Sequence, residues 1–245
     1  MKILFIGCVR FSEKILFSLI KNKFKIIGVC TKKKSDFNSD FVDLSYICKK
    51  NNIDCIYSKN INHPEIVNWI KEKKPDIILC LGWSQLLSES ILKIPPKGVI
   101  GFHPAELPAN RGRHPIIWTL VLGLKSTAST FFFMNQTADA GEIISQEKIF
   151  LNHNDDAKIL YEKIINTALL QVKRFLPLIE NDSLKTRPQT ELYSNSWRKR
   201  SYKDGLIDWR MSANSIHNLI KALTKPYPGA VFIHNEREYK IWRSE

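Results

Sequence analysis

Short apolar runs and amphipathic segments alternate along the first half of the chain. Continuous apolar runs of strand length predict strands at 2–7, 25–30, 54–57, 76–81, 98–102 and 128–134. Helical spacing of the apolar residues between them predicts helices at 11–21, 41–50 and 64–73, and a further helix that starts at Pro115. Apolar strands separated by helices are typical of a parallel sheet covered on both faces. We therefore expect an α/β fold with a doubly wound, mostly parallel sheet, whose ligands bind beyond the carboxyl ends of the strands.

The second half of the chain is less regular. Its pattern predicts a long helix, a polar linker or edge, a second helix and a hairpin of two alternating strands, at 155–180, 181–205, 212–223, 230–234 and 238–242. We expect Pro177 to interrupt the long helix, Ser212 to cap the second helix and Pro226 to stop it. We therefore divide the chain into a core, residues 1–180, and a small C-terminal extension with a helix and a β-hairpin, residues 181–245.

Composition narrows the class of protein. The 245 residues, 44% of them hydrophobic, are enough to bury one sizeable core. The apolar start, MKILFIG, is too short for a secretory signal or a membrane span, so we expect a cytoplasmic protein without a membrane partner. Five cysteines without a Cys-x-x-Cys pair predict reduced thiols and no metal site. The net charge of +13 comes largely from scattered lysines, so charge alone does not choose between tRNA and a nucleotide.

Two loops that follow strands carry candidate chemistry. The strand at 98–102 runs into His103, and a loop rich in proline, glycine and arginine comes next. An imidazole at a strand end above a rigid loop is a natural acid/base group. Asp139 follows the strand at 128–134 between small residues, so it can reach a neighbouring strand end and orient the imidazole. G-x-G-x-x-G does not follow the first strand and the P-loop motif is absent, which removes the main support for a dinucleotide site.

The motifs of these two loops resemble those of the folate-dependent formyltransferases. They are His103-Pro104, Leu107-Pro108-x-x-Arg111-Gly112 and Asp139-x-Gly141-x-Ile143, and the resemblance extends over residues 1–180. It resumes at Ile207-Asp208-Trp209 and at Pro226-Tyr227-Pro228-Gly229-Ala230. The chain is most similar to the sugar-nucleotide N-formyltransferases of this family. The family implies a Rossmann-like core, 10-formyltetrahydrofolate as the formyl donor and an amine as the acceptor.

The resemblance also implies site residues. His103 and Asp139 correspond to the family's catalytic pair, in which the imidazole stabilises an oxyanion or relays a proton. Loops at 82–86 and 135–141 resemble the family's folate pocket, where backbone groups contact the pterin. The cofactor-binding residues implied in this way are Gly82, Trp83, Gln85, Leu87, Asn135, Thr137 and Asp139. Leu87 could pack on the ring, but a leucine is more often a simple core residue.

One position departs from the family pattern. The family has an Asn two residues before the catalytic His, and here that position is Gly101, which has no side chain to donate to an oxyanion. Three alternatives follow: His103 acts alone, another donor such as the Asn110 or Asn135 amide, a backbone N–H or a water substitutes, or catalysis is impaired. We expect retained activity, with Asn110 as a candidate third catalytic residue.

The amine substrate is a choice between classes. In methionyl-tRNA formyltransferase a barrel-like C-terminal domain helps to hold the tRNA, and the seventeen residues after Pro228 are too few for five strands. Glycinamide ribonucleotide transformylase lacks the Pro226-Tyr-Pro-Gly region. We therefore expect the substrate to be an amino-deoxysugar linked to dTDP or UDP, for bacterial surface glycans such as the O-antigen of lipopolysaccharide. The alternatives are a methionyl-tRNA formyltransferase-like enzyme and a folate- or nucleotide-binding protein with impaired catalysis.

The expected substrate contacts lie in the His103 loop and past the core. They are Arg111, Gly112, Arg113, His114, Trp197, Arg198, Lys199, Tyr202 and Tyr227, which offer cations for a diphosphate and rings for a base. A solvated basic stretch explains the 197–202 patch equally well, and Arg111 is at least as suited to clamping its loop. The partner is then a small-molecule sugar nucleotide rather than nucleic acid. A homodimer is also expected, with the terminal hairpin as its candidate contact.

Overall fold

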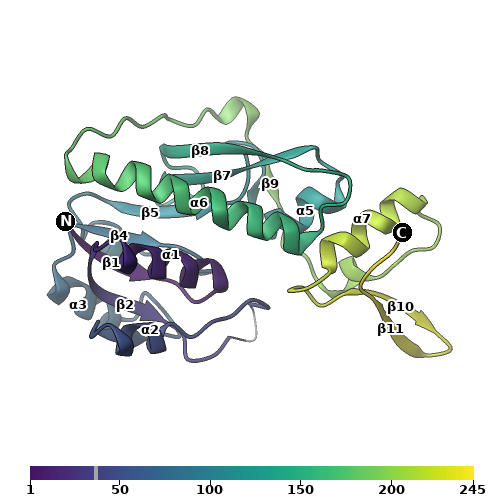
Figure 1. Ribbon diagram of the computed structural model, residues 1–245, viewed down its shortest axis with the longest axis horizontal. Helices are drawn as coiled ribbons and strands as arrows, with labels where there is room; N and C mark the ends of the chain where they lie inside the picture. Colours follow the sequence, from purple (N-terminus) through teal and green to yellow (C-terminus); the bar gives the residue numbers. More distant parts are fainter. Residues whose placement is uncertain (36–37) are drawn as a thin grey trace. The chain divides into compact units, whose positions relative to one another are not determined.

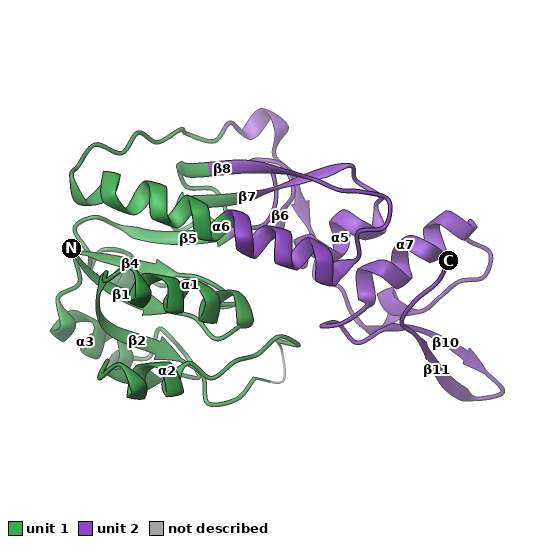
Figure 2. Ribbon diagram, in the orientation of Figure 1, with its two compact units in different colours: residues 1–102, 130–145, 168–189 green, residues 103–129, 146–167, 190–245 purple. Residues whose placement is uncertain are grey.

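The computed structural model describes residues 1–35 and 38–245, which form two compact units (Figures 1 and 2). The first unit comprises residues 1–102, 130–145 and 168–189, and the second comprises 103–129, 146–167 and 190–245. The chain passes from one unit to the other within three strands and one helix, namely β5 (Val99–His103), β7 (Ser126–Phe133), β8 (Ile143–Phe150) and α6 (Ala157–Glu180), and once more between Gln189 and Thr190. The predicted domain division at residue 180 stays a prediction.

A seven-stranded sheet has the order β3-β2-β1-β4-β5-β7-β8. Its remaining strands are β1 (Lys2–Ile6), β2 (Lys25–Thr31), β3 (Cys55–Tyr57) and β4 (Ile77–Cys80). The pairs β1–β2, β1–β4, β2–β3 and β4–β5 are all parallel. The predicted α/β class with a mostly parallel sheet is therefore confirmed.

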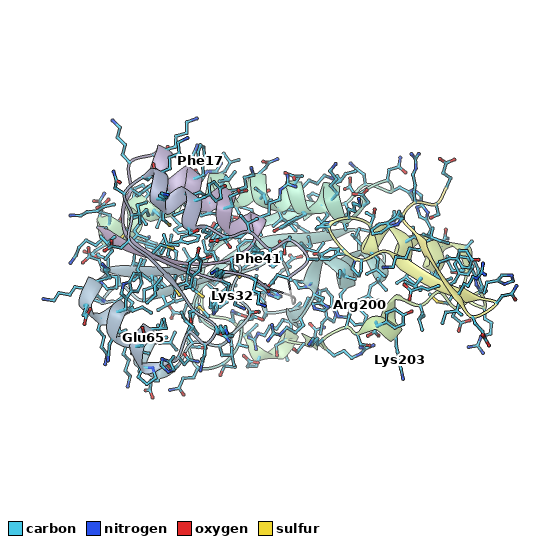
Figure 3. The ribbon with its side chains drawn as sticks, turned by 90° about the horizontal axis from the view of Figure 1, so that it is seen from below. Phe17, Lys32, Phe41, Glu65, Arg200 and Lys203 are labelled. Carbon is cyan, nitrogen blue, oxygen red and sulfur yellow. The ribbon has the colours of Figure 1, made fainter. Side chains whose placement is uncertain are left out.

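Both faces of the sheet in the first unit are covered. Leu4 and Ile6 of β1 pack in one apolar cluster with Ile66 and Ile70 of α3 (Pro64–Lys73). The intervening residues of β1 are also fully buried, as a strand covered on both faces requires. The other helices of this unit are α1 (Arg10–Lys21), α2 (Ser45–Lys50) and α4 (Glu89–Leu92). On α1, Phe17 keeps an exposed ring (Figure 3).

Stacked phenylalanines join the elements of the first unit around the end of β5. Phe102 stacks on Phe11 of α1 with 4.2 Å between ring centroids, and it meets Phe131 of β7 at 4.9 Å. Phe131 in turn meets Phe175 of α6 at 4.9 Å. Such aromatic pairs contribute stabilisation beyond that of their buried area. These contacts therefore hold the end of β5, which leads into residue 103, against α1 and β7.

The second unit contains the predicted second helix and hairpin. Its elements are β6 (Arg111–Gly112), α5 (Pro115–Val121), β9 (Ser196–Trp197), α7 (Ala213–Leu223), β10 (Ala230–His234) and β11 (Arg237–Ile241), with 3₁₀ turns at Glu191–Tyr193 and Tyr202–Gly205. The Ser212 hydroxyl caps α7 by accepting the Ser215 N–H at 3.2 Å. The β10–β11 turn is closed by Asn235 and Glu236, both with positive φ, which matches the twist of a two-residue hairpin.

Two local expectations were wrong. No strand was expected at β8, because its middle residues are polar; the strand forms by antiparallel pairing with β7, from Phe133 N–H to Glu142 O at one end and Leu151 N–H to Lys125 O at the other. Helix α6 continues through Pro177, whose carbonyl still accepts the Asn181 N–H at 3.1 Å. The 181–205 segment, expected as a linker or edge, carries β9 and two 3₁₀ turns.

All five cysteines are free thiols, and Cys55 alone among them is exposed. Within residues 1–35 and 38–245, no helix has both the length and the apolar content needed to cross a membrane.

Candidate functional site

The His103 imidazole lies at the carboxyl end of β5 and is buried, with 4% of the residue exposed. Its Nε2 is 2.8 Å from the backbone oxygen of Asn110. A carbonyl oxygen can only accept, so Nε2 carries the hydrogen and donates it. The ring is thus held in one orientation and with a defined protonated nitrogen, as an acid/base group requires.

The loop that supplies this carbonyl is fastened to a distant part of the second unit. Asn110 has a left-handed backbone, with φ of 64°. Its N–H donates to Asn195 Oδ1, and Asn195 Nδ2 donates back to Asn110 Oδ1 at 3.2 Å. The Arg111 N–H donates to the Asn195 carbonyl at 3.0 Å. Asn195 could not be identified from the sequence, since no motif connects two residues 85 positions apart.

Arg111 is a clamp on the same loop. Its buried guanidinium forms two parallel hydrogen bonds with Glu191, at 3.0 and 2.9 Å. These bonds, with a smaller contribution from Ser194, hold the pKa of the Glu191 carboxyl below its usual value. Bidentate pairs fix geometry as well as charge. This geometry favours the clamp alternative for Arg111 over direct contact with a substrate.

Gly112 allows the loop to approach β9 closely. Its φ is +99°, and a Cβ there would lie 2.3 Å from the backbone oxygen of Trp197. The two short strands β6 and β9 pair in parallel, and the Arg113 N–H donates to the Trp197 carbonyl at 3.0 Å. Only glycine meets both demands, so the glycine of the loop motif has a structural role.

The Asp139 loop belongs to the first unit. Asp139 also has a left-handed backbone, with φ of 56°. The Gln189 amide nitrogen donates to the carbonyls of Asp139 and Gly141, at 2.9 and 2.7 Å. A Cβ on Gly141 would lie 1.6 Å from the Phe133 oxygen, so this position requires glycine. Gln189, like Asn195, was not identified from the sequence.

Packing explains why position 101 has no side chain. A Cβ on Gly101 would lie 2.8 Å from the ring of Phe132 and 2.9 Å from Met134 Cγ. The space that an Asn side chain would enter is therefore filled by two large side chains. Asn110 remains a predicted substitute donor; its Oδ1 is engaged by Asn195, so the donor would be its Nδ2.

The predicted folate loop at 82–86 is held by contacts between a side chain and distant backbone groups. Gly82 has φ of 73°, and Gln85 is committed within the chain, accepting the Ile61 N–H at 3.1 Å and donating to the Lys59 carbonyl at 2.8 Å. Leu87 lies in the core cluster of the first unit. The Asn135 side chain accepts the Thr137 N–H at 2.9 Å and shapes the second predicted folate loop.

Trp83 offers a feature that fits a bound heterocycle. Within the described residues its buried indole Nε1 has no hydrogen-bond acceptor. Lys32, labelled in Figure 3, lies over the ring with Nζ 4.9 Å from the centroid. A buried donor without an acceptor costs free energy, which a ligand acceptor would recover. The residues present therefore fit a pterin-bearing folate.

The predicted nucleotide patch of the second unit is engaged in contacts of its own. Trp197 stacks on Trp118 at 6.4 Å, and the Arg200 guanidinium lies 4.6 Å from the Trp118 ring centroid (Arg200 is labelled in Figure 3). Arg198 forms a bidentate pair with Asp204, which holds the pKa of that carboxyl well below its usual value. A nucleotide would have to share these side chains, so their use as substrate contacts stays a prediction.

The remaining predicted substrate contacts differ in exposure. His114 accepts the Arg200 N–H on Nδ1 at 3.3 Å, and burial, with the nearby Arg200 charge, lowers the pKa of its imidazole. Tyr202 is exposed and donates its hydroxyl to Glu238 at 2.8 Å. Lys199 is exposed and Tyr227 is half-buried.

Each unit gathers part of the predicted site. The second unit brings His103 and Asn110 together, whereas Asp139 lies in the first unit. The expected pairing of His103 with Asp139 therefore stays a prediction. Within the described residues, no group of three His, Cys, Asp or Glu side chains is arranged to hold a metal ion.

Comparison with known families gives two matches. A family model described as formyl transferase matches residues 1–171. A second model, described as the formyl transferase C-terminal domain, matches residues 199–245. The two matches together include both loops of the candidate site and most of the segment after α6.

Individual proteins agree with these matches. The chain is 38% identical over 233 residues to the bifunctional polymyxin resistance protein ArnA of Wigglesworthia glossinidia brevipalpis; the match covers 94% of this chain and 36% of that protein. The chain thus spans about a third of the length of this curated relative.

Solved structures share the fold. A 4-N formyltransferase from Francisella tularensis has a TM-score of 0.79 and 20% identity, covering 98% of this chain and 96% of that one. The N-formyltransferase from Helicobacter canadensis, in complex with folinic acid and dTDP-3-aminofucose, has a TM-score of 0.74 and 19% identity, covering 96% and 85%. A sugar N-formyltransferase from Shewanella sp FDAARGOS_354 has a TM-score of 0.79 and 15% identity, covering 100% and 97%.

Proposed function

The chain belongs to the formyl transferase family, and on this premise we propose that it transfers the formyl group of 10-formyltetrahydrofolate to the amine of a dTDP- or UDP-linked amino-deoxysugar. The observation that carries the proposal is the His103 imidazole, fixed by a backbone carbonyl at a strand end within a family-matched core. The fit of the folate rests on the unpartnered indole N–H of Trp83 among the described residues.

The chemistry follows from what these side chains can do. 10-Formyltetrahydrofolate supplies the formyl group when it is bound. The attacking amine must be neutral, and negative charge develops on the formyl oxygen as the new bond forms. Because the Asn110 carbonyl holds the Nε2 hydrogen, His103 would act through Nδ1, which either donates to that oxygen when it is protonated or takes a proton from the amine and passes it to the folate nitrogen that leaves. Asp139 would orient the ring. Gly101 cannot contribute a donor, so the Asn110 Nδ2 or a backbone N–H does.

The substrate class rests on two supports. Solved relatives of the same fold include enzymes described as sugar N-formyltransferases, one of them in complex with dTDP-3-aminofucose. The second unit also presents Trp118, Trp197 and Arg200 in one cluster, next to exposed Lys199. Rings and cations in one place suit a base and a diphosphate. The match of residues 199–245 to a C-terminal domain model keeps methionyl-tRNA as an alternative acceptor to be tested.

The experiment is a substrate panel. The purified protein is incubated with 10-formyltetrahydrofolate and dTDP- or UDP-linked amino sugars, and tetrahydrofolate release and formylated product are measured. We expect release with at least one amino sugar and none with methionyl-tRNA. Formylation of methionyl-tRNA alone would replace the proposed substrate. Folate binding without release for any acceptor would support impaired catalysis.

A variant pair tests the role of His103 in the same assay. We expect His103→Asn to lower the rate by about 10²–10⁴-fold, the usual contribution of a positioned acid/base group. The matched control is His63→Asn, because the His63 side chain is 61% exposed and lies ahead of α3. Equal rates in the His103 and His63 variants would refute the assignment.

We further propose that the product serves surface glycan assembly in the cytoplasm and that the enzyme is a homodimer. The terminal hairpin exposes Ile233 and Tyr239, which suit a contact with a second copy. Sedimentation of the wild type and of Ile233→Glu tests this: a dimer that the variant converts to a monomer supports it, and a wild-type monomer contradicts it.

A further inference from the structure

Residues 187–197, here called the anchoring segment, carry side chains that fasten both predicted catalytic loops. We propose that Asn195 and Gln189 are positioning residues, Asn195 for His103 and Gln189 for Asp139. The inference rests on the proposed function, because it assigns these residues a role in formyl transfer. Asn195 acts through Asn110, and Gln189 acts through the backbone of the Asp139 turn, each within its own unit.

Asn195 acts through Asn110. The Asn110 carbonyl accepts the Nε2–H of His103. The Asn110 backbone N–H donates to Asn195 Oδ1, and Asn195 Nδ2 donates to Asn110 Oδ1. An amide side chain suits this place because it offers both an acceptor and a donor, which match the Asn110 N–H and Oδ1. The imidazole orientation therefore depends on a residue 92 positions later in the chain.

Gln189 acts on the Asp139 turn directly. Its two N–H groups meet the two carbonyls on either side of Ala140, at 2.9 and 2.7 Å. The start of the segment is itself fixed, because Arg187 and Ile143 exchange both backbone hydrogen bonds, at 2.8 and 2.9 Å. The pairing of Arg187 with Ile143 thus fixes the backbone two residues before Gln189, whose side chain donates to the turn.

The backbone of the anchored residues shows why anchors are needed. Asn110 and Asp139 both have positive φ, of 64° and 56°. Residues other than glycine adopt this conformation at a cost, and it persists where the surroundings impose it. Removing an anchor would let each turn relax toward ordinary backbone angles. A misplacement of about 1 Å at a catalytic group can lower the rate by about 10²-fold.

The Asn195 arm compares Asn195→Ala and Asn195→Asp with the control Asn214→Ala, which changes an exposed Asn on α7. We expect Asn195→Ala to lower kcat by roughly 10–100-fold while the KM for 10-formyltetrahydrofolate changes less than about 3-fold. Asn195→Asp keeps the acceptor for the Asn110 N–H, so it should retain more of kcat. Wild-type kcat in Asn195→Ala would overturn this arm.

The Gln189 arm compares Gln189→Met with Gln189→Glu. Met fills the space without donors, whereas Glu at neutral pH places a charged acceptor against two carbonyls. We expect both variants to lose kcat by roughly 10-fold or more, with the larger loss for Glu. Gln189→Asn, which keeps the amide group, should recover part of the loss. Equal activity in the Met and Asn variants would contradict the donor role.

A spectroscopic readout separates this inference from the proposed function. The ¹⁵N shifts of the His103 ring, assigned with His103→Asn, report which nitrogen carries the hydrogen whether or not the enzyme is active. We expect the Nε2–H tautomer in the wild type and mixed tautomers in Asn195→Ala. If the wild type is inactive but the His103 tautomer changes in Asn195→Ala, the proposed function is refuted and the anchoring role of Asn195 is supported. If the wild type is active and the tautomer is the same in every variant, the proposed function is supported and the anchoring role is refuted.

Discussion

Gly101 allows the packing around the catalytic strand to be tested quantitatively. The perturbation is Gly101→Ala, which adds only the Cβ, followed by Gly101→Asn, which restores the family side chain. The added Cβ would lie 2.8 Å from Phe132 Cζ and 2.9 Å from Met134 Cγ. Carbon atoms pack best at about 3.5–4.0 Å, so the ring or the Met side chain has to move by roughly 0.7 Å. The backbone at this glycine is outside the left-handed region, so the crowding is the main cost.

The magnitude follows from that crowding. Overpacking a filled site costs about 1–3 kcal/mol of unfolding free energy. Replacing glycine also restricts the unfolded chain, which offsets about 0.4–1 kcal/mol. We therefore expect a net loss of about 1–2 kcal/mol for Gly101→Ala, or roughly 2–8 °C in Tm for a chain of this size. Gly101→Asn should lose more, because it also buries an amide.

The assay is urea unfolding, monitored by tryptophan fluorescence, of Gly101→Ala, Met134→Ala and the double variant. Truncating Met134 makes room for the new Cβ, so the double variant should be less destabilised than the sum of the singles, by about 1 kcal/mol. Strict additivity would show that Met134 does not fill the space, and a Gly101→Asn protein as stable as the wild type would refute the packing argument. A higher formyl-transfer rate in that variant would show that an Asn donor can still be accommodated.

Three further predictions concern the two loops. The Arg111 pair holds the pKa of Glu191 below its unfolded value, so its stabilisation is present above pH 4.5 and lost as pH falls further; the Tm difference between wild type and Glu191→Gln should shrink between pH 7 and 3. Burial and Arg200 lower the pKa of His114, so as pH decreases the unfolded state takes up the proton before the folded state does. When pH is lowered past 6.5, the Tm of the wild type should therefore decrease more than the Tm of His114→Phe. A pH-independent difference in either pair of proteins would contradict the assignment. Gly141→Ala should lose roughly 3 kcal/mol or more, measured by urea unfolding, because no Cβ fits 1.6 Å from a backbone oxygen; a soluble variant of wild-type stability would disprove this.

Much of the fold could be predicted from the sequence because its signals are local. The buried strands have continuous apolar runs, and the Ser212 cap and the turn after His234 depend on residues within a few positions. β8 could not be predicted in this way, because its polar middle is set by pairing with β7 and not by its own pattern. The loops of His103 and Asp139 were recognisable because their motifs resemble those of a known family, whereas the contact that requires glycine at position 112 comes from the distant Trp197.

The sequence by itself therefore determined most of the succession of strands and helices along the chain. It also determined which two loops carry an imidazole and a carboxylate. Only the tertiary structure decided which ring nitrogen of His103 holds the hydrogen, what fills the space beside Gly101, and that Asn195 and Gln189 hold the two loops. The reason is physical. Hydrogen bonds and packing between residues tens of positions apart leave no periodicity in a sequence, and they form only when folding brings the partners within about 3 Å.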